Sequence, residues 1–127
     1  MTTETITARR SRRETACTAL AALFLLLSAA QIVLAAAGAF GLGWDGHGFA
    51  NALAMFVVGV LLFIATLVAK GGWKRILAAL LLLVVMDVQG RIGAYALETP
   101  VLGIFHGVGA LVIIGLGGHL LHASRRR

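Results

Sequence analysis

Four apolar runs, each about as long as a lipid bilayer is thick, make up most of this 127-residue chain. They cover residues 16–40, 48–69, 76–96 and 101–121. A helix of about 20 residues rises ~30 Å, which is the thickness of the hydrocarbon layer. A soluble fold of this size has too few polar residues to cover four such runs, since 60% of the chain is hydrophobic and 13% is charged. The runs therefore predict an integral membrane protein that contacts the lipid bilayer.

The connections between the runs are short, and this restricts how the helices are arranged. Short loops force neighbouring helices to be antiparallel, so the sequence predicts an all-α fold, a transmembrane four-helix up-down-up-down bundle. This membrane domain covers residues 16–122. We expect a disordered basic tail over 1–15 and a second basic tail over 123–127. Pro100 stands at the first helical position of the last span, where its missing N–H costs no hydrogen bond.

The positive charges predict how the bundle is oriented in the membrane. Ten of the eleven Lys and Arg residues fall on one predicted side: Arg9, Arg10, Arg12, Arg13, Lys70, Lys74, Arg75, Arg125, Arg126 and Arg127. Cytoplasmic loops carry such an excess, so both termini are expected in the cytoplasm and the protein in the bacterial plasma membrane, the cell inner membrane. A net charge of +6 would also suit a nucleic-acid binder. Anionic lipid and membrane orientation explain the clusters, however, and no nucleic-acid partner is expected.

The start of the chain has a second interpretation, a cleaved signal peptide. Its arginine-rich head precedes an apolar run, and Ala37-Gly38-Ala39 resembles a cleavage site. The run over 16–40 is longer than the apolar part of a signal peptide, which favours a membrane span. Cys17 near the start of this run is the only cysteine, so an intrachain disulfide is excluded. We interpret it as a small apolar residue.

Polar side chains inside the spans are costly, so their positions are the best indication of function. Most belong to the predicted outer half of the bundle: Gln31, His47, Asn51, Asp87, Gln89, Arg91 and His106. The inner half offers fewer: Thr18, Ser28 and Thr66. The sequence therefore predicts that a polar site would lie in the outer leaflet.

Two histidines on separate spans form the sharpest candidate site. Imidazoles such as those of His47 and His106 hold a haem iron from both faces in membrane bundles, which makes them candidate ligands of haem b. Three further polar residues would line the surroundings: Gln31, Asn51 and Gln89. The two histidines differ in depth by ~9 Å, which helix tilt must absorb. The alternative is that each histidine hydrogen-bonds a neighbouring helix or sits at the membrane interface, and that no cofactor is bound.

Asp87 and Arg91 are spaced one helical turn apart on the third span. Side chains at this spacing share a helix face, so the sequence predicts an ion pair that neutralises two costly charges. We interpret the pair as structural, and a proton relay is the alternative. Gln89 points away from both and is predicted either to cross to another helix, with Gln31 as a candidate partner, or to face lipid.

Three classes of function remain open. The first is a haem b-binding or quinone-associated redox module with its site in the outer leaflet. The second is a non-catalytic accessory or assembly subunit, because no loop is large enough for an active site. Its partner would be a second copy or another subunit of a membrane complex. A small dimeric transporter that uses Asp87 as its coupling acid fits less well, because Arg91 would hold Asp87 ionised.

The motifs of hydrolytic and metal chemistry are missing from the sequence. It contains no Ser-His-Asp grouping, no CxxC or HExxH motif and no phosphate-binding glycine loop. We assign no catalytic residue and no metal ligands, and the sequence favours a protein that is not an enzyme.

The order of the polar residues resembles a family of small bacterial four-helix membrane proteins that is classed as a domain of unknown function. The residues that carry the resemblance are Gln31, His47, Gln89 and the segment from Leu102 to His106. The resemblance spans most of the chain and implies the fold but no reaction. His47 and His106 also look like the histidines of cytochrome b-type bundles, including haem-A-synthase-like halves, which implies haem binding. Those proteins usually place paired histidines on both helices or build two bundles, whereas in this sequence the inner histidine pair is incomplete.

Overall fold

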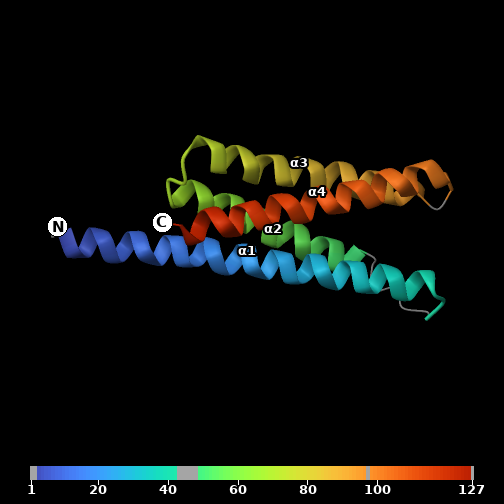
Figure 1. Cartoon of the computed structure of the whole chain (residues 1–127), viewed down its shortest axis with the longest axis horizontal. Coiled ribbons are helices and arrows are strands. Elements are labelled where there is room, and N and C mark those ends of the chain that lie inside the picture. The colour runs from blue at the N-terminus through green and yellow to red at the C-terminus, as the bar shows by residue number, and fades with distance from the viewer. Residues whose placement is uncertain (1–2, 43–48, 97, 127) are drawn as a thin grey trace.

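A computed structural model of the chain describes residues 3–42, 49–96 and 98–126, with side chains from Arg12 on the first helix and from Ala52 on the second. Four helices follow one another: α1 (Thr3–Ala39), α2 (Phe49–Val68), α3 (Trp73–Ala96) and α4 (Pro100–Arg125). Successive helices run in opposite directions, so the fold is the predicted all-α up-down bundle (Figure 1). Both termini and the α2–α3 turn lie at one end, here called the terminal end, and the α3–α4 turn lies at the other, the far end.

The lengths and compositions of the helices confirm a multi-pass membrane protein. Three segments of the described residues are long and apolar enough to cross a bilayer: Arg12–Ala39, Trp73–Ala96 and Pro100–Arg125. The apolar part of α2, Ala52–Val68, is shorter. Many large apolar side chains on all four helices point outward, as expected of a bundle that lipid surrounds.

Helix α1 begins earlier than the sequence predicts. The expected disordered tail over 1–15 is helical from Thr3 onward, so that prediction is wrong for the part that the structure describes. The segment contains Ala, Glu and Arg, which favour helices, and has neither Gly nor Pro to interrupt one. Helix α4 likewise continues to Arg125, beyond the expected boundary at residue 121, and places basic side chains in its last turn, where they favour the helix dipole.

The two described turns differ in how they end a helix. Lys70 and Gly72 adopt φ values of 51° and 78° between α2 and α3, and the Gly71 N–H donates to the Thr66 carbonyl, closing the end of α2. Thr99 is extended, and Pro100 opens α4 at the predicted first helical position.

The helices pack in a ring, α1 against α2, α2 against α3, α3 against α4 and α4 against α1. Buried positions recur every three or four residues, as on α1 at Glu14, Cys17, Ala21, Phe24 and Ser28. This spacing is that of helices packed at a small crossing angle. The largest completely buried apolar side chains lie in the half of the bundle nearer the terminal end: Cys17, Phe24, Leu62, Leu82 and Leu120.

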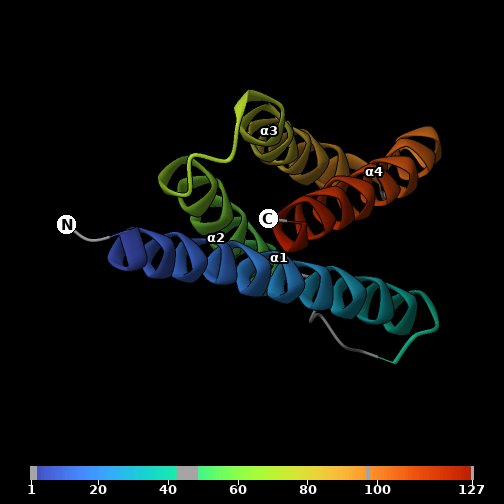
Figure 2. The ribbon, with the colours of Figure 1, turned by 60° about the vertical axis from the view of Figure 1, so that its left-hand side comes forward.

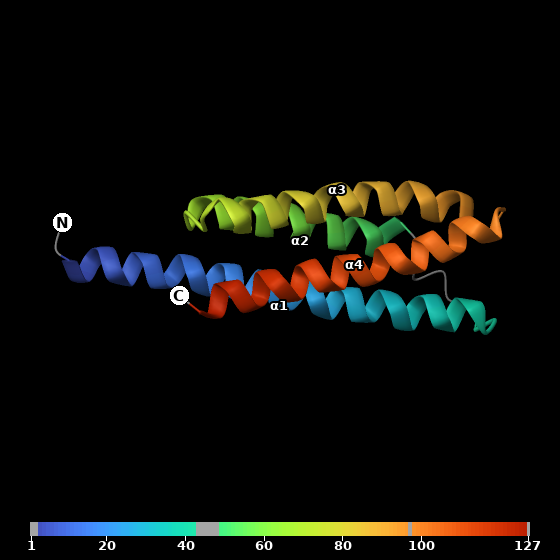
Figure 3. The same ribbon diagram turned by 45° about the horizontal axis from the view of Figure 1, so that its top comes forward.

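Helix α4 crosses the bundle diagonally. Figure 3 shows it beside α1 at the terminal end and beside α3 at the far end, and Figure 2 shows the α3–α4 pair diverging from α1 toward the far end. Glycines make the close approaches possible. A Cβ atom on Gly117 would lie 3.1 Å from Phe24 of α1. The crossing places two different polar clusters at the two ends of the same helix.

Candidate functional sites

The residues predicted to form the outer-leaflet site separate into groups. His47 lies outside the described residues, and so does the side chain of Asn51. Gln31 is half-buried on α1, whereas Gln89 and His106 meet between α3 and α4 in the half of the bundle nearer the far end. The structure therefore joins two of the predicted residues directly.

Gln89 and His106 interlock through glycines on the opposite helix. The Gln89 Nε2 group donates a hydrogen bond to the main-chain carbonyl of His106, and the Gln89 amide fills the place that a side chain at Gly109 would need. The His106 ring lies over Gly93, where an added Cβ atom would stand 2.8 Å from Cε1 and 3.1 Å from Nδ1. Gln89 thus crosses to another helix, one of the two predicted outcomes. Gly93 thus makes room for His106, and Gly109 makes room for Gln89.

This geometry bears on how a haem would fit. On the α3 side of His106, the space left by Gly93 is taken up by the imidazole itself. On the α4 surface, Gly107 has no described atom within 4 Å of an added Cβ, so the backbone there is open to a flat ligand. The described residues contain no group of three His, Cys, Asp or Glu side chains suited to a metal ion. Haem ligation by His106 and His47 stays a prediction.

Asp87 and Arg91 form the ion pair that the sequence predicts. Arg91 Nε lies 3.0 Å from Asp87 Oδ2, and Nη2 lies 3.4 Å from Oδ1. The side chains point away from the bundle, with 58% of Asp87 and 77% of Arg91 exposed. Intramembrane charges almost always face a protein interior or a water-filled cavity. This pair instead lies on a surface that meets either lipid or another protein.

The ion pair belongs to a continuous exposed stripe along α3, here called the α3 outer face. The stripe is made up of Leu77, Leu80, Val84, Asp87, Arg91 and Tyr95. Its members are spaced three or four residues apart, as in a helix seam that packs against another helix. Gly90 and Ala94 lie beside the pair, exposed and one turn apart. Small residues at this spacing let two membrane helices approach closely.

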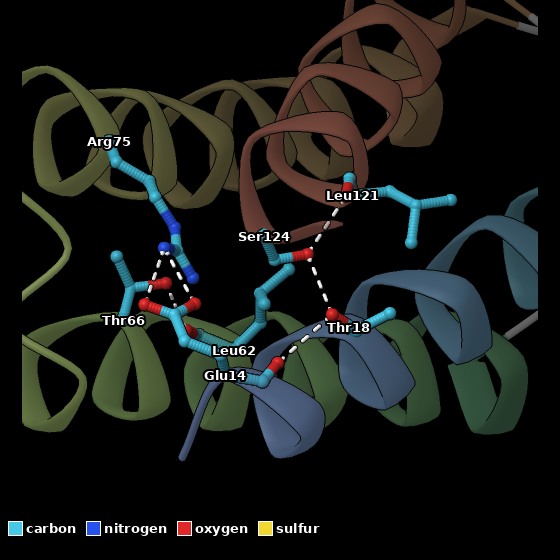
Figure 4. Close-up of polar contacts among 7 residues, drawn as sticks. All are labelled: Glu14, Thr18, Leu62, Thr66, Arg75, Leu121 and Ser124. Carbon is cyan, nitrogen blue, oxygen red and sulfur yellow. Dashed lines mark hydrogen bonds and ion pairs between the residues drawn. The ribbon is translucent and has the colours of Figure 1, made fainter. Parts of the chain in front are cut away.

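The terminal end holds a second polar cluster, which the sequence reading missed. Arg75 of α3 points between the helices, and its Nη1 lies 2.8 Å from Oε2 of Glu14 on α1 (Figure 4). Only 5% of the Arg75 side chain and 10% of the Glu14 side chain are exposed. Among the described residues, the Nε and Nη2 atoms of Arg75 have no hydrogen-bond partner. The sequence assigns Thr18 and Thr66 to this half of the bundle, but it does not predict the buried charges of Glu14 and Arg75.

Hydroxyl groups extend this cluster to the other two helices. The Thr18 hydroxyl lies 2.9 Å from the Glu14 carbonyl oxygen and 3.0 Å from the Ser124 hydroxyl, which donates to the Leu121 carbonyl (Figure 4). Thr66 of α2 donates to the carbonyl of Leu62 within its own helix. The buried polar side chains at the terminal end thus come from all four helices: Glu14, Thr66, Arg75 and Ser124.

Two signals in the sequence point to this cluster in retrospect. Glu14 lies three residues before Cys17 and seven before Ala21, so it continues the buried face of α1. Arg75 stands four residues before Ala79 and has the same relation to the buried face of α3. Glu14 belongs to the expected disordered tail, and Arg75 lies just before the apolar run over 76–96. The periodicity within the apolar runs therefore does not include either residue.

A shallow pocket of about 330 Å³ lies beside the α2–α3 turn at the terminal end. Residues from the turn, the start of α3 and the end of α4 line it, among them Trp73, Lys74 and His119. The Lys74 amine lies 5.8 Å from the centre of the Trp73 ring. Exposed Trp and Lys side chains of this kind anchor helices at the membrane–water interface.

Comparison with known proteins gives no match: no family model, no curated protein and no solved structure is similar to this chain. The four-helix fold therefore rests on the structure itself, and the resemblance of the polar residues to the two families stays an expectation.

Proposed function

We propose that this protein is a non-enzymatic assembly subunit of the membrane, and that its α3 outer face binds another transmembrane helix. The observation that carries the proposal is the exposed Asp87–Arg91 ion pair. A site of catalysis is not needed for this function, and the short described turns leave little room for one.

The depth of the ion pair makes its exposure costly in a monomer. Asp87 and Arg91 are nine and five residues from the end of α3 at Ala96, or ~14 Å and ~8 Å from it along the helix axis. A charged side chain near the centre of a membrane helix costs about 2.5–3.5 kcal/mol on insertion scales. Pairing the charges lowers this cost but leaves hydrogen-bonding atoms facing hydrocarbon. A partner helix that supplies polar groups would remove the remaining free-energy cost, because those atoms would then form hydrogen bonds.

The shape of the same surface supports a helix as the partner. Gly90 is exposed, and no described atom lies within 4 Å of the position that its Cβ would take. Together with Ala94 it forms a small patch on which a second helix can approach the α3 backbone. Apolar side chains extend the stripe above and below the charges, so one helix could pack along its whole length.

Photo-crosslinking in native membranes tests this proposal. A photoreactive residue at Val84 of α3 is compared with one at Leu26 of α1, because both positions are exposed and lie at similar distances from the far ends of their helices. We expect Val84 to give a discrete protein adduct and Leu26 to give none. If Val84 and Leu26 react alike, with lipid only, the α3 outer face is not a protein contact.

Haem b binding, or association with a quinone, is a second proposal, supported by the half-buried His106 beside the open backbone at Gly107. His106 and His47 would hold the iron, and the haem would supply one-electron transfer. Purified protein should then show a Soret band that disappears in His106→Ala. A colourless preparation that takes up no added haem would rule this function out.

A further inference from the structure

We infer that the partner on the α3 outer face is a second copy of this chain, joined through a ring of four charges made by Asp87 and Arg91 of both copies. This inference rests on the proposed function and names the partner. It follows from the signs of the charges, from the direction in which two copies would insert, and from the spacing along α3.

The α3 outer face is complementary to itself in charge. Its ion pair presents one acid and one base and has no net charge. A partner with a single charge would leave one member of the pair without an opposite charge, and an apolar partner would satisfy neither. A second copy offers an acid and a base at the same depth, so every charge gains a second opposite neighbour.

Two copies would insert in the same direction. Both termini and the α2–α3 turn lie at the terminal end (Figure 1). All the cations with described side chains except Arg91 belong to the segments at this end: Arg12, Arg13, Lys70, Lys74, Arg75, Arg125 and Arg126. Such an asymmetry orients each copy alike in the membrane. The two α3 helices would then be parallel, related by a two-fold axis along the membrane normal, which gives a closed dimer with the same surface on both sides.

The spacing of the charges suits this parallel arrangement. In a symmetric parallel pair, Arg91 of one copy is offset by four residues along the axis from the partner's Asp87. This is the same axial offset, ~6 Å, that Arg91 already spans to reach Asp87 in its own helix. The Arg91 guanidinium has further N–H groups to donate, because the internal pair uses Nε and one Nη2 contact. One guanidinium can therefore bridge the carboxylates of both copies.

The packing around the charges is equally symmetric. Gly90 and Ala94 would meet the same residues of the second copy, which permits a close backbone contact next to the charge ring. The spacings of three and four residues alternate from Leu77 to Arg91, as in the seam of a left-handed helix pair.

Disulfide crosslinking of the full chain in lipid vesicles tests the dimer. Cys17 is replaced by Ala, and a single cysteine is placed at Val84 or, as the control, at Leu26. We expect an intermolecular disulfide from Val84→Cys and at least about tenfold less from Leu26→Cys.

Charge exchange then tests the ring itself. Asp87→Arg and Arg91→Asp should each reduce the Val84→Cys disulfide by about tenfold, because every copy then carries like charges. A mixture of the two variants should restore it, since each supplies what the other lacks, and this restoration also shows that both variants fold. The double variant Asp87→Arg/Arg91→Asp should crosslink alone, because it is again self-complementary.

The outcomes separate this inference from the proposed function. A protein that stays monomeric in vesicles but gives a Val84 adduct with a different protein in native membranes overturns the second copy and keeps the assembly function. If the yield of the Val84→Cys disulfide is the same in all three charge variants as in the parent chain, the charge ring is overturned although the dimer stands. Absence of both the disulfide and the native-membrane adduct overturns the inference and the proposed function together.

Discussion

At the scale of single residues, the buried Glu14–Arg75 pair is the interaction with the largest expected effect on stability. Arg75→Ala leaves the Glu14 carboxylate buried without its opposite charge, which typically costs about 3–5 kcal/mol. We expect a marked fall in the thermal unfolding temperature of Arg75→Ala in detergent micelles. The double variant Glu14→Leu/Arg75→Met should recover most of the loss, because an apolar pair of similar volume avoids burying charge. Arg12→Ala, at an exposed position, is the control, and an Arg75→Ala variant as stable as this control would contradict the prediction.

The glycines between α3 and α4 give a second prediction at this scale. In Gly93→Ala the new methyl group meets the His106 ring, and in Gly109→Ala it overlaps the Gln89 amide. Overpacking of this kind costs about 1–3 kcal/mol, so both variants should unfold at lower temperature. Gly115→Ala on α4 is the matched control, since no described atom lies within 4 Å of its added Cβ. It should be neutral or stabilising because Ala favours helices by about 1 kcal/mol over Gly. Equal unfolding temperatures for Gly93→Ala and Gly115→Ala would show that the His106 contact is not tight.

Residue spacing predicted some of these contacts and not others. The Asp87–Arg91 pair followed from a four-residue spacing within one helix, and the structure confirms it. Which way the pair points depends on how α3 is rotated in the bundle, and a local spacing does not determine that. The Glu14–Arg75 pair joins residues 61 positions apart, so it depends on two helices meeting at the right depth. The Gln89–His106 contact also depends on glycines of the facing helix, which a one-helix pattern does not reveal.

At the scale of elements, α3 has two sides with different roles. One side buries Arg75, Ala79, Leu82 and Gln89 inside the bundle, and the other presents the α3 outer face. The four helices themselves were predictable because each apolar run is long and ends at a polar turn. The ends of the helices were less predictable, since α1 and α4 extend past the apolar runs. Helix formation depends on backbone propensity and capping as well as on apolarity.

The two sides of α3 lead to a third prediction. The double variant Asp87→Asn/Arg91→Gln changes only exposed side chains, so the stability of the monomer in detergent should change by no more than about 0.5 kcal/mol. Self-association in vesicles should fall in the same variant, since the charge ring is removed. Unfolding and crosslinking are measured on the same preparation. A variant that loses stability and association together would place the pair in the monomer fold instead of the interface.

A transporter would respond differently to a change on the same helix. Asp87→Asn alone removes a coupling acid, so proton-coupled flux of a substrate would disappear while the dimer persisted. In the assembly function, Asp87→Asn weakens association because it removes the acid that the partner's Arg91 contacts. Measuring flux and association on this variant therefore separates the two classes of function.

At the scale of the whole molecule, the diagonal path of α4 joins two polar clusters. Its terminal end contacts α1 through Ser124 and Thr18, and its far end contacts α3 through the backbone of His106. Both are partly buried contacts between helices, whereas the Asp87–Arg91 pair is exposed on the surface of the bundle. The internal polar groups therefore join helices within the bundle, whereas the proposed partner would bind the exposed pair.

The direction of insertion decides which dimer that surface can form. Lys74→Cys at the terminal end and Thr99→Cys at the far end are compared in a Cys17→Ala background. Both positions are exposed, and Thr99 makes no capping hydrogen bond that the change would remove. Positive charge at the terminal end predicts that a membrane-impermeant maleimide labels Thr99→Cys on intact cells and leaves Lys74→Cys unlabelled until the membrane is permeabilised. Labelling of both from outside would mean that copies insert in both directions. An antiparallel pair would then place the charges of the two copies in opposite halves of the membrane, because Asp87 and Arg91 both lie past the midpoint of α3 toward its far end. The charge ring could not form in such a pair, and the two-fold axis of the dimer would lie in the membrane plane.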